Sequence, residues 1–141
     1  MNEIHIRIAD WKTDHAALRR IREAVFIAEQ AVPPELEWDA DDASAVHFLA
    51  LEGEYPMGTA RLLPDGHIGR VAVLKDWRGL KVGDKLIRAV IAEAEQRGLK
   101  QQMLSAQVQA SSFYERFGFA VVSGEFLDAG IPHVDMVRHS D

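Results

Sequence analysis

An arginine and a lysine alternate with two glycines in one short stretch between an apolar segment and a helical pattern. Arg78, Gly79, Lys81 and Gly83 all fall within KDWRGLKVG, residues 75–83. The first N–H groups of a helix have no partner inside the helix, and its N-terminus carries about half a positive charge, so phosphate can bind there. Glycines let the backbone approach a ligand closely, and the cations add donors. The stretch predicts a site for a phosphorylated ligand, although an ordinary turn before a helix has a similar composition.

The spacing excludes two common phosphate loops. A G-x-x-x-x-G-K-[ST] loop requires Lys directly after its last glycine, whereas Gly83 is followed by Asp84. The chain also lacks the G-x-G-x-x-G pattern of dinucleotide-binding folds.

A second stretch with possible chemistry is QVQASSFYERFGF, residues 107–119. Tyr114 in this stretch could donate a proton, and an amphipathic core residue of a short helix would be the ordinary structural role for it. Both stretches resemble signatures of the GNAT superfamily of N-acetyltransferases. The first resembles the acyl-CoA loop [Q/R]-x-x-G-x-[G/A], with Lys81 in place of the middle glycine. The second resembles N-x-x-A-x-x-[FLY]-Y-x-x-x-G-F, with Gln107 at the Asn position.

Further stretches, among them VFIAEQAVPPELEWDADD and AGIPHVDM, resemble a bacterial subgroup of small single-domain GNAT proteins of mostly unassigned substrate. This resemblance implies an α+β fold over one domain, residues 1–141. The expected sheet is mixed and mostly antiparallel, with six to seven strands, about four flanking helices and a splay between strands 4 and 5.

The resemblance implies acetyl-CoA as acyl donor. The pantetheine arm is expected to pair with the central strand as an added strand, and the pyrophosphate to bind the loop that follows. The implied contact residues are Val71, Ala72, Val73, Arg78, Gly79, Leu80, Lys81, Val82, Gly83, Asp84, Gln107 and Tyr114.

The implied reaction is direct transfer of acetyl to a primary amine. The backbone N–H of Val73 or Leu74 is expected to stabilise the oxyanion, a contribution of about 3 kcal/mol. Tyr114 is expected to protonate the leaving thiolate. Because a free Tyr has a pKa of about 10 and a thiol about 8.5, this transfer is uphill unless the site lowers the pKa of Tyr114.

Four side chains are candidates for the general base: Glu29, Glu35, His67 and His133. A base acting through one water is an alternative, and each of the four also has an ordinary structural role.

The N-terminal half predicts a strand at Ile4–Ile8 and then a helix with Thr13 or Asp14 as its cap. Leu18, Ile21, Val25 and Ala28 form the apolar face of this helix, and the opposite face is basic, with Arg19, Arg20 and Arg22. After Pro33 and Pro34, residues 35–42 contain five carboxylates. We interpret them as a solvated loop or as an acidic rim that attracts an amine.

The remaining elements follow from apolar periodicity and turn residues. Strands are predicted at 45–51, 57–63 and 68–74, forming an antiparallel meander, and later at 102–108 and 133–138. Helices are predicted at 84–97 and 110–117.

Composition narrows the class of protein. The 141 residues carry a net charge of −6, which argues against a nucleic-acid binder and favours a cationic amine as partner, either a small molecule or a protein. There is no cysteine, no histidine spacing typical of a metal site, no G-x-S-x-G motif and no apolar run that suits a membrane or a signal peptide. We expect a cytoplasmic N-acetyltransferase, with a homodimer possible; the alternative is a degenerate acyl-CoA-binding sensor or interaction module.

Overall fold

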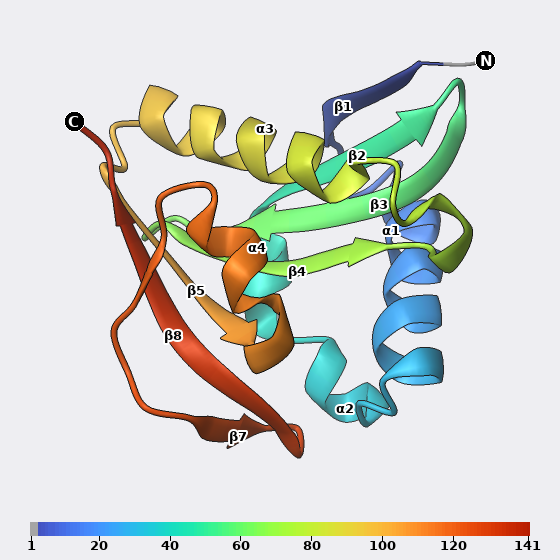
Figure 1. The fold of residues 1–141 in the computed structure, drawn as a ribbon. Coiled ribbons are helices and arrows are strands. Elements are labelled where there is room, and N and C mark those ends of the chain that lie inside the picture. Colours follow the sequence, from blue (N-terminus) through green and yellow to red (C-terminus); the bar gives the residue numbers. More distant parts are fainter. Residues whose placement is uncertain (1–2) are drawn as a thin grey trace.

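The computed structural model describes residues 3–141, which form one mixed sheet with helices on both faces (Figure 1). The strand order is β1-β2-β3-β4-β5-β8-β6, with β7 paired to β8. Every neighbouring pair is antiparallel except β4 and β5, which are parallel. The strands are β1 Ile4–Ala9, β2 Val46–Glu52, β3 Tyr55–Leu62, β4 His67–Val73, β5 Gln101–Gln107, β6 Ala120–Val121, β7 Phe126–Asp128 and β8 Ile131–His139.

The predicted fold class and the β2-β3-β4 meander are confirmed. The sheet has eight strands, whereas six to seven were predicted. The difference comes from β6 and β7, which are only two and three residues long. Strands this short carry little periodicity, which is why the sequence pattern does not reveal them.

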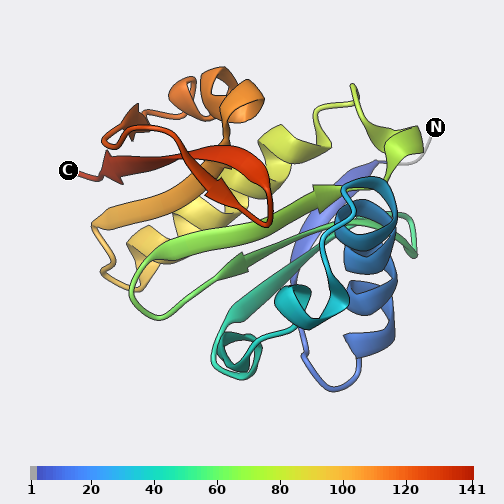
Figure 2. The same ribbon diagram turned by 90° about the horizontal axis from the view of Figure 1, so that it is seen from below.

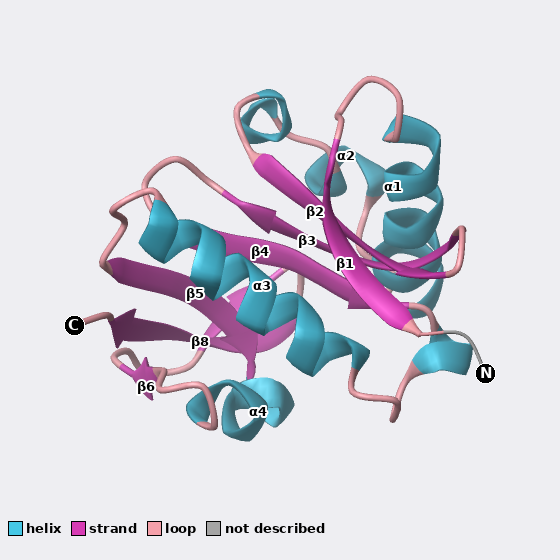
Figure 3. Ribbon diagram, turned by 90° about the horizontal axis from the view of Figure 1, so that it is seen from above, coloured by secondary structure: helices cyan, strands magenta, loops and turns pink. Residues whose placement is uncertain are grey.

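Four α-helices flank the sheet: α1 His15–Arg22, α2 Pro34–Glu37, α3 Val82–Gln96 and α4 Ser111–Glu115. From above, α3 lies across one face of the sheet, with α1 behind the strands (Figure 3). The view from below shows α1 and α2 together on that second face (Figure 2). Strand β2 is buried on both sides, since Phe48 and Ala50 join the core under α3 while Leu49 and Leu51 join the core under α1.

The predicted first helix changes its winding after Arg22. Residues Glu23–Glu29 form a π-helical segment, with Gln30 N–H donating to the Val25 carbonyl at 3.2 Å. Bonding from i to i+5 shifts the phase of the helix, so Ala28 is exposed and the prediction that it lies on the apolar face is wrong. At the end of this segment, Glu29 pairs with Arg78, which follows β4, and Gln30 bonds Gln107 on β5.

Asp14 precedes α1, as predicted, but does not cap it. Its carboxylate accepts hydrogen bonds from the Asp10 N–H and the Arg7 guanidinium, both at 2.8 Å, and therefore holds the preceding turn instead of the helix. None of the helices within residues 3–141 combines the length and apolar character that a bilayer-spanning segment needs.

Candidate active site

A cleft opens where β4 and β5 separate. The two strands pair only at His67 with Met103 and at Ile68 with Leu104, and beyond these pairs they diverge, which confirms the predicted splay (Figure 1). The cleft has a volume of about 560 Å³. Its walls come from β4, β5, α4, the π-helical segment, α2 and the turn between β7 and β8.

The edge of β4 that faces this opening carries unpaired backbone groups. Leu74 N–H donates to the Met57 carbonyl at 2.8 Å, and Ala72 lies opposite Thr59 on β3. Because bonded and non-bonded pairs alternate along an antiparallel ladder, the N–H and C=O groups of Val71 and Val73 point away from β3, toward the opening. The Val73 N–H is thus available for an oxyanion, whereas the expectation that Leu74 could serve instead is wrong.

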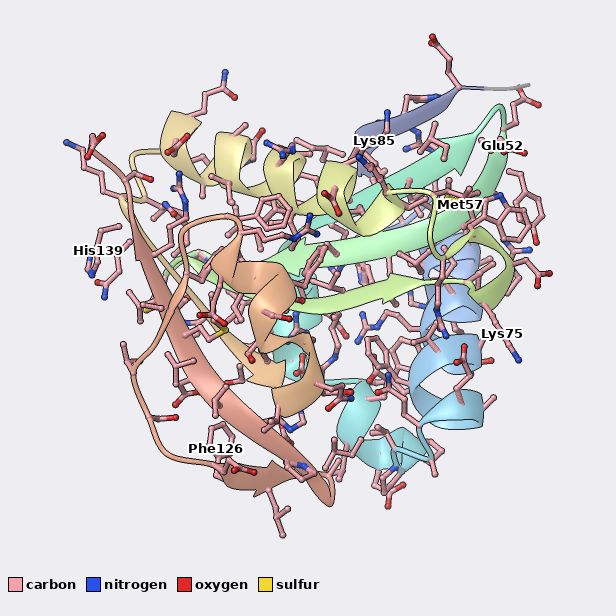
Figure 4. All side chains as sticks on the ribbon, viewed as in Figure 1. Glu52, Met57, Lys75, Lys85, Phe126 and His139 are labelled. Carbon is pink, nitrogen blue, oxygen red and sulfur yellow. The ribbon has the colours of Figure 1, made fainter. Side chains whose placement is uncertain are left out.

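The predicted phosphate loop ends at the N-terminus of α3. Figure 4 labels Lys75, near the start of the connection between β4 and α3, and Lys85, in the first turn of α3. Lys81, directly before α3, has the left-handed backbone angles φ 62° and ψ 25°, and its side chain is exposed. The first N–H groups of α3, from Val82 to Asp84, have no acceptor within the helix. This is the arrangement that anions bind.

Arg78 lies in this loop but is already bonded. Its guanidinium forms a two-point ion pair with Glu29 at 2.7 and 2.8 Å, and its Nε donates to the Val73 carbonyl at 2.9 Å. The bond to Arg78 lowers the pKa of Glu29. A pyrophosphate would therefore compete with Glu29 for Arg78, and Glu29 is a weakened candidate for the general base.

Gly83 packs against α4. A Cβ at this position would lie 3.3 Å from the Cζ of Phe113, closer than most carbon contacts allow. Asp84 also reaches α4, forming an ion pair with Arg116 at 3.2 Å. The glycine thus serves the contact between α3 and the short helix that carries Tyr114, a role separate from ligand approach.

Tyr114 lines the cleft from α4, with its ring packed edge-on against Phe113 and Phe119. Burial raises the pKa of Tyr114 to about 12. Acid catalysis by Tyr114 was expected to need a lowered pKa, and the surroundings shift it in the opposite direction because they hold no cation or donor that would stabilise the phenolate within residues 3–141.

The other base candidates differ in their surroundings. Glu35 is exposed and does not line the cleft. His67 does line it, but its ring is half exposed and its Nδ1 bonds the Asp65 carboxylate at 2.8 Å. His133 lines the cleft with Nδ1 2.7 Å from the Ile131 carbonyl and its ring stacked on Phe126. A carbonyl only accepts, so Nδ1 carries the proton and Nε2 of neutral His133 has a free lone pair.

Gln107 joins the end of β5 to the π-helical segment. Its Nε2 donates to the Gln30 Oε1 at 2.9 Å, and its Oε1 accepts from Gln109 at 2.6 Å. The residue lines the cleft, as the resemblance implied.

The acidic run 35–42 divides into two groups: Glu35 and Asp41 are exposed, as a solvated loop predicts, and the other three carboxylates pair with arginines and form no free acidic rim. Glu37 and Asp42 are 2% and 4% exposed, and both bond Arg22, itself 1% exposed. Asp39 and Asp42 bond Arg61 at 2.8 Å each. Arg22 therefore does not belong to a basic exposed face. Its position four residues after Leu18, on the apolar side of α1, was the signal in the sequence that pointed inward.

Glu37, Arg61 and Arg70 are cleft residues that sequence reasoning missed. Burial raises the pKa of the Glu37 carboxyl, although Arg70 and Arg22 act against that shift. Within residues 3–141 no three His, Asp or Glu side chains gather in a way that would hold a metal ion.

Comparison with known proteins agrees with this geometry. The model of the acetyltransferase (GNAT) domain family matches residues 9–140. The chain is 40% identical to an uncharacterized N-acetyltransferase of Bacillus subtilis, YjcF, over 84% of this chain and 87% of that protein. It is 34% identical to the protein ElaA of Escherichia coli, over 86% and 85%.

Solved structures share the fold over nearly the whole chain. The crystal structure of Escherichia coli ElaA has a TM-score of 0.85 at 28% identity and covers 96% of this chain and 99% of its own. An acyl-CoA N-acyltransferase from Pseudomonas aeruginosa has a TM-score of 0.83 at 29% identity, covering 98% and 99%. Because the family model matches residues 9–140 and a relative is 40% identical over most of both chains, this chain belongs to the GNAT acetyltransferase family.

Proposed function

We propose that this protein transfers acetyl from acetyl-CoA to a primary amine of a small molecule or a protein. The observation that carries the proposal is the splay of β4 from β5 in a GNAT chain. It brings the β4 edge at Val71 and the Tyr114 side chain into the lining of one cleft, and the chain continues from the end of β4 to the N-terminus of α3.

The residues of the cleft have separate tasks in this proposal. The backbone of Val71 pairs with an amide group of the pantetheine arm, while the Val73 carbonyl stays bonded to Arg78 Nε, and the N–H groups at the start of α3 bind the pyrophosphate. The Val73 N–H then stabilises the oxyanion that forms as the amine attacks the thioester carbonyl. As the C–S bond breaks, Tyr114 donates its proton to the thiolate sulfur.

We propose His133 as the group that accepts the amine proton, directly or through one water. His67 and His133 both line the cleft, and each uses Nδ1 in a hydrogen bond, which leaves Nε2 to accept a proton. We choose His133 because its ring is partly buried and stacked on Phe126, whereas the His67 side chain is 51% exposed. Arg78 holds Glu29 in an ion pair.

The test is calorimetric titration of the pure protein with acetyl-CoA, with ATP and NAD as controls, followed by an assay of thiol release with primary amines. We expect micromolar binding of acetyl-CoA alone and amine-dependent thiol release. Binding without release for any amine would favour the alternative, a non-catalytic acyl-CoA-binding module, and no binding would contradict both. The cytoplasmic location and the homodimer stay predictions.

A further inference from the structure

One charged side chain in the cleft has no task in acetyl transfer. Arg70 lies on β4 at a β-bulge. Gly69 pairs with Arg61 and Ala72 pairs with Thr59, so β4 has one more residue between these two pairs than β3 has. This bulge is centred on Arg70, whose φ is 49°. Regular alternation would direct Arg70 to the same side as Ile68, into the apolar core under α3. The bulge turns it instead to the side of α2.

The contacts of Arg70 hold its guanidinium in one orientation. Its Nε lies 3.2 Å from Oε2 of Glu37, and its Nη2 donates to the Glu37 carbonyl at 3.0 Å and to Asp39 at 3.2 Å. Its Nη1 donates to no atom of residues 3–141. Among the side-chain atoms of that range, Nε of Arg61 is the one buried nitrogen that lacks a hydrogen-bond partner. Nη1 of Arg70 also lacks a partner and is not buried in this sense, so it is open to solvent. Two N–H bonds of a fixed guanidinium are therefore free.

Space for a ligand group lies directly beside this donor. Gly69 precedes Arg70 and also lines the cleft, and a Cβ built on it would meet no atom within 4 Å. Gly69 pairs with Arg61 across the strands, so its missing side chain would lie on the same face as Arg61. The floor of the cleft next to α2 is thus empty and is bordered by two arginines.

At this end of the cleft, within residues 3–141, three carboxylates near α2 are paired, and the group of Arg70 that is left without a partner is a donor, Nη1. Glu37, Asp39 and Asp42 are taken up by Arg22, Arg61 and Arg70. Asp128, the other carboxylate residue of the cleft lining, is exposed on β7. A carboxylate is the group that a fixed arginine fork binds with the best geometry.

We propose that the acceptor is an amine that also carries a carboxylate, such as an amino acid or a peptide terminus, and that Arg70 binds this carboxylate above Gly69. The inference rests on the proposed N-acetyltransfer and adds the class of the substrate. It replaces the expectation of a purely cationic amine drawn by an acidic rim.

The experiment measures binding to the protein saturated with CoA, which has no acetyl group to transfer. The probes are matched pairs: lysine with 1,5-diaminopentane, phenylalanine with phenethylamine, and short peptides with their C-terminal amides. We expect each carboxylate to bind about tenfold to a hundredfold more tightly than its partner, as a charge-assisted hydrogen bond predicts. Equal binding within pairs, tighter binding of the partners, or no binding of any carboxylate would overturn the proposal.

A substitution at Gly69 tests where the carboxylate binds and leaves the ion pairs of Arg70 intact. Gly69→Leu fills the empty space and should abolish the preference for carboxylates while leaving the CoA affinity unchanged. Gly124→Leu is the matched control, because Gly124 also has open space around it and does not line the cleft. Retained preference in Gly69→Leu would overturn the placement. Failure of CoA to bind the unaltered protein would count against the proposed function, and a CoA complex without carboxylate preference would count against this inference alone.

Discussion

The raised pKa of Tyr114 makes proton transfer from its hydroxyl to the leaving thiolate unfavourable, although the side chain lines the cleft. Its pKa of about 12 exceeds that of a thiol, about 8.5, by enough to make full proton transfer uphill by about 5 kcal/mol. Even the fully formed thiolate is a weaker base than the Tyr114 phenolate, so the transfer stays uphill and is completed only when Tyr114 regains a proton. The same high pKa keeps Tyr114 protonated at every pH where the protein would work.

Tyr114→Phe removes the proton donor and retains the ring that packs on Phe113 and Phe119. We expect acetyl-CoA affinity to stay the same and kcat to fall at least about tenfold, toward the low end of general acid catalysis. Steady-state kinetics and calorimetry check both values. Equal turnover by the two proteins would remove Tyr114 from the mechanism.

The raised pKa also predicts the pH dependence of the unaltered protein. Ionisation of Tyr114 should not lower kcat as the pH rises to about 11.

Helix α3 and helix α4 meet at the end where the ligand is expected to bind. The contact between Gly83 and Phe113 fixes α4, and α4 in turn carries Tyr114 into the cleft. Lys81 adopts a backbone conformation that favours glycine, at a cost of about 1–2 kcal/mol. Lys81, where the GNAT signature has glycine, therefore takes a left-handed backbone conformation and leaves its side chain in solvent.

Gly83→Val tests this contact between elements. The added methyl groups would press on Phe113, so we expect the free energy of unfolding to fall by about 1–3 kcal/mol and kcat to fall with the displacement of Tyr114. Chemical denaturation and thiol-release kinetics measure the two effects. Gly124→Val, at a glycine with no neighbours within 4 Å, is the control and should change neither value. An unchanged kcat in Gly83→Val would show that α4 does not depend on this contact.

At the scale of the molecule, a buried cluster of charges joins α1, α2 and the turn at residues 40–43 to β3 and β4. Asp42 occupies its centre, because it bonds both Arg22 and Arg61 at 2.8 Å. These partners lower the pKa of Asp42 against the cost of burial. Breaking one such buried pair usually costs about 3–5 kcal/mol, since a charge is left without compensation.

The pH dependence of stability follows from these shifts. Asp39 and Asp42 have pKa values below the 3.8 of the unfolded chain, so the unfolded state binds more protons as the pH falls. The stability they contribute is complete above that value and is lost below it. Glu37 acts in the opposite direction, because its raised pKa makes the folded state bind its proton first as the pH falls toward 4.5.

Asp42→Asn should lower the free energy of unfolding by about 3–5 kcal/mol at pH 7 and flatten its fall between about pH 4 and pH 2. Urea unfolding at both ends of this range measures the change. Asp41→Asn is the matched control, since the adjacent Asp41 side chain is exposed and makes no ion pair within residues 3–141. If the free energy of unfolding of Asp42→Asn falls with pH as steeply as that of the unaltered protein, groups other than Asp42 cause the acid sensitivity.

Local pattern was enough to predict much of this protein. Apolar periodicity located the main strands and the central helix within about two residues, because it depends on neighbours along one element. The family and the splay were expected from the resemblance of two spaced signatures to GNAT proteins. Gln107, Tyr114 and His133, which line the cleft, and Val73 on β4 stay predictions as functional residues.

Tertiary structure alone decided which charges meet. Arg22 pairs with Glu37 across 15 residues, and Arg78 pairs with Glu29 across 49, so neither pairing has a local period that a sequence could display. The direction of Arg70 depends on a bulge whose register is set by the facing strand β3. Burial then decided the pKa of Tyr114, because desolvation depends on the elements packed around a group and not on the residues beside it in the chain.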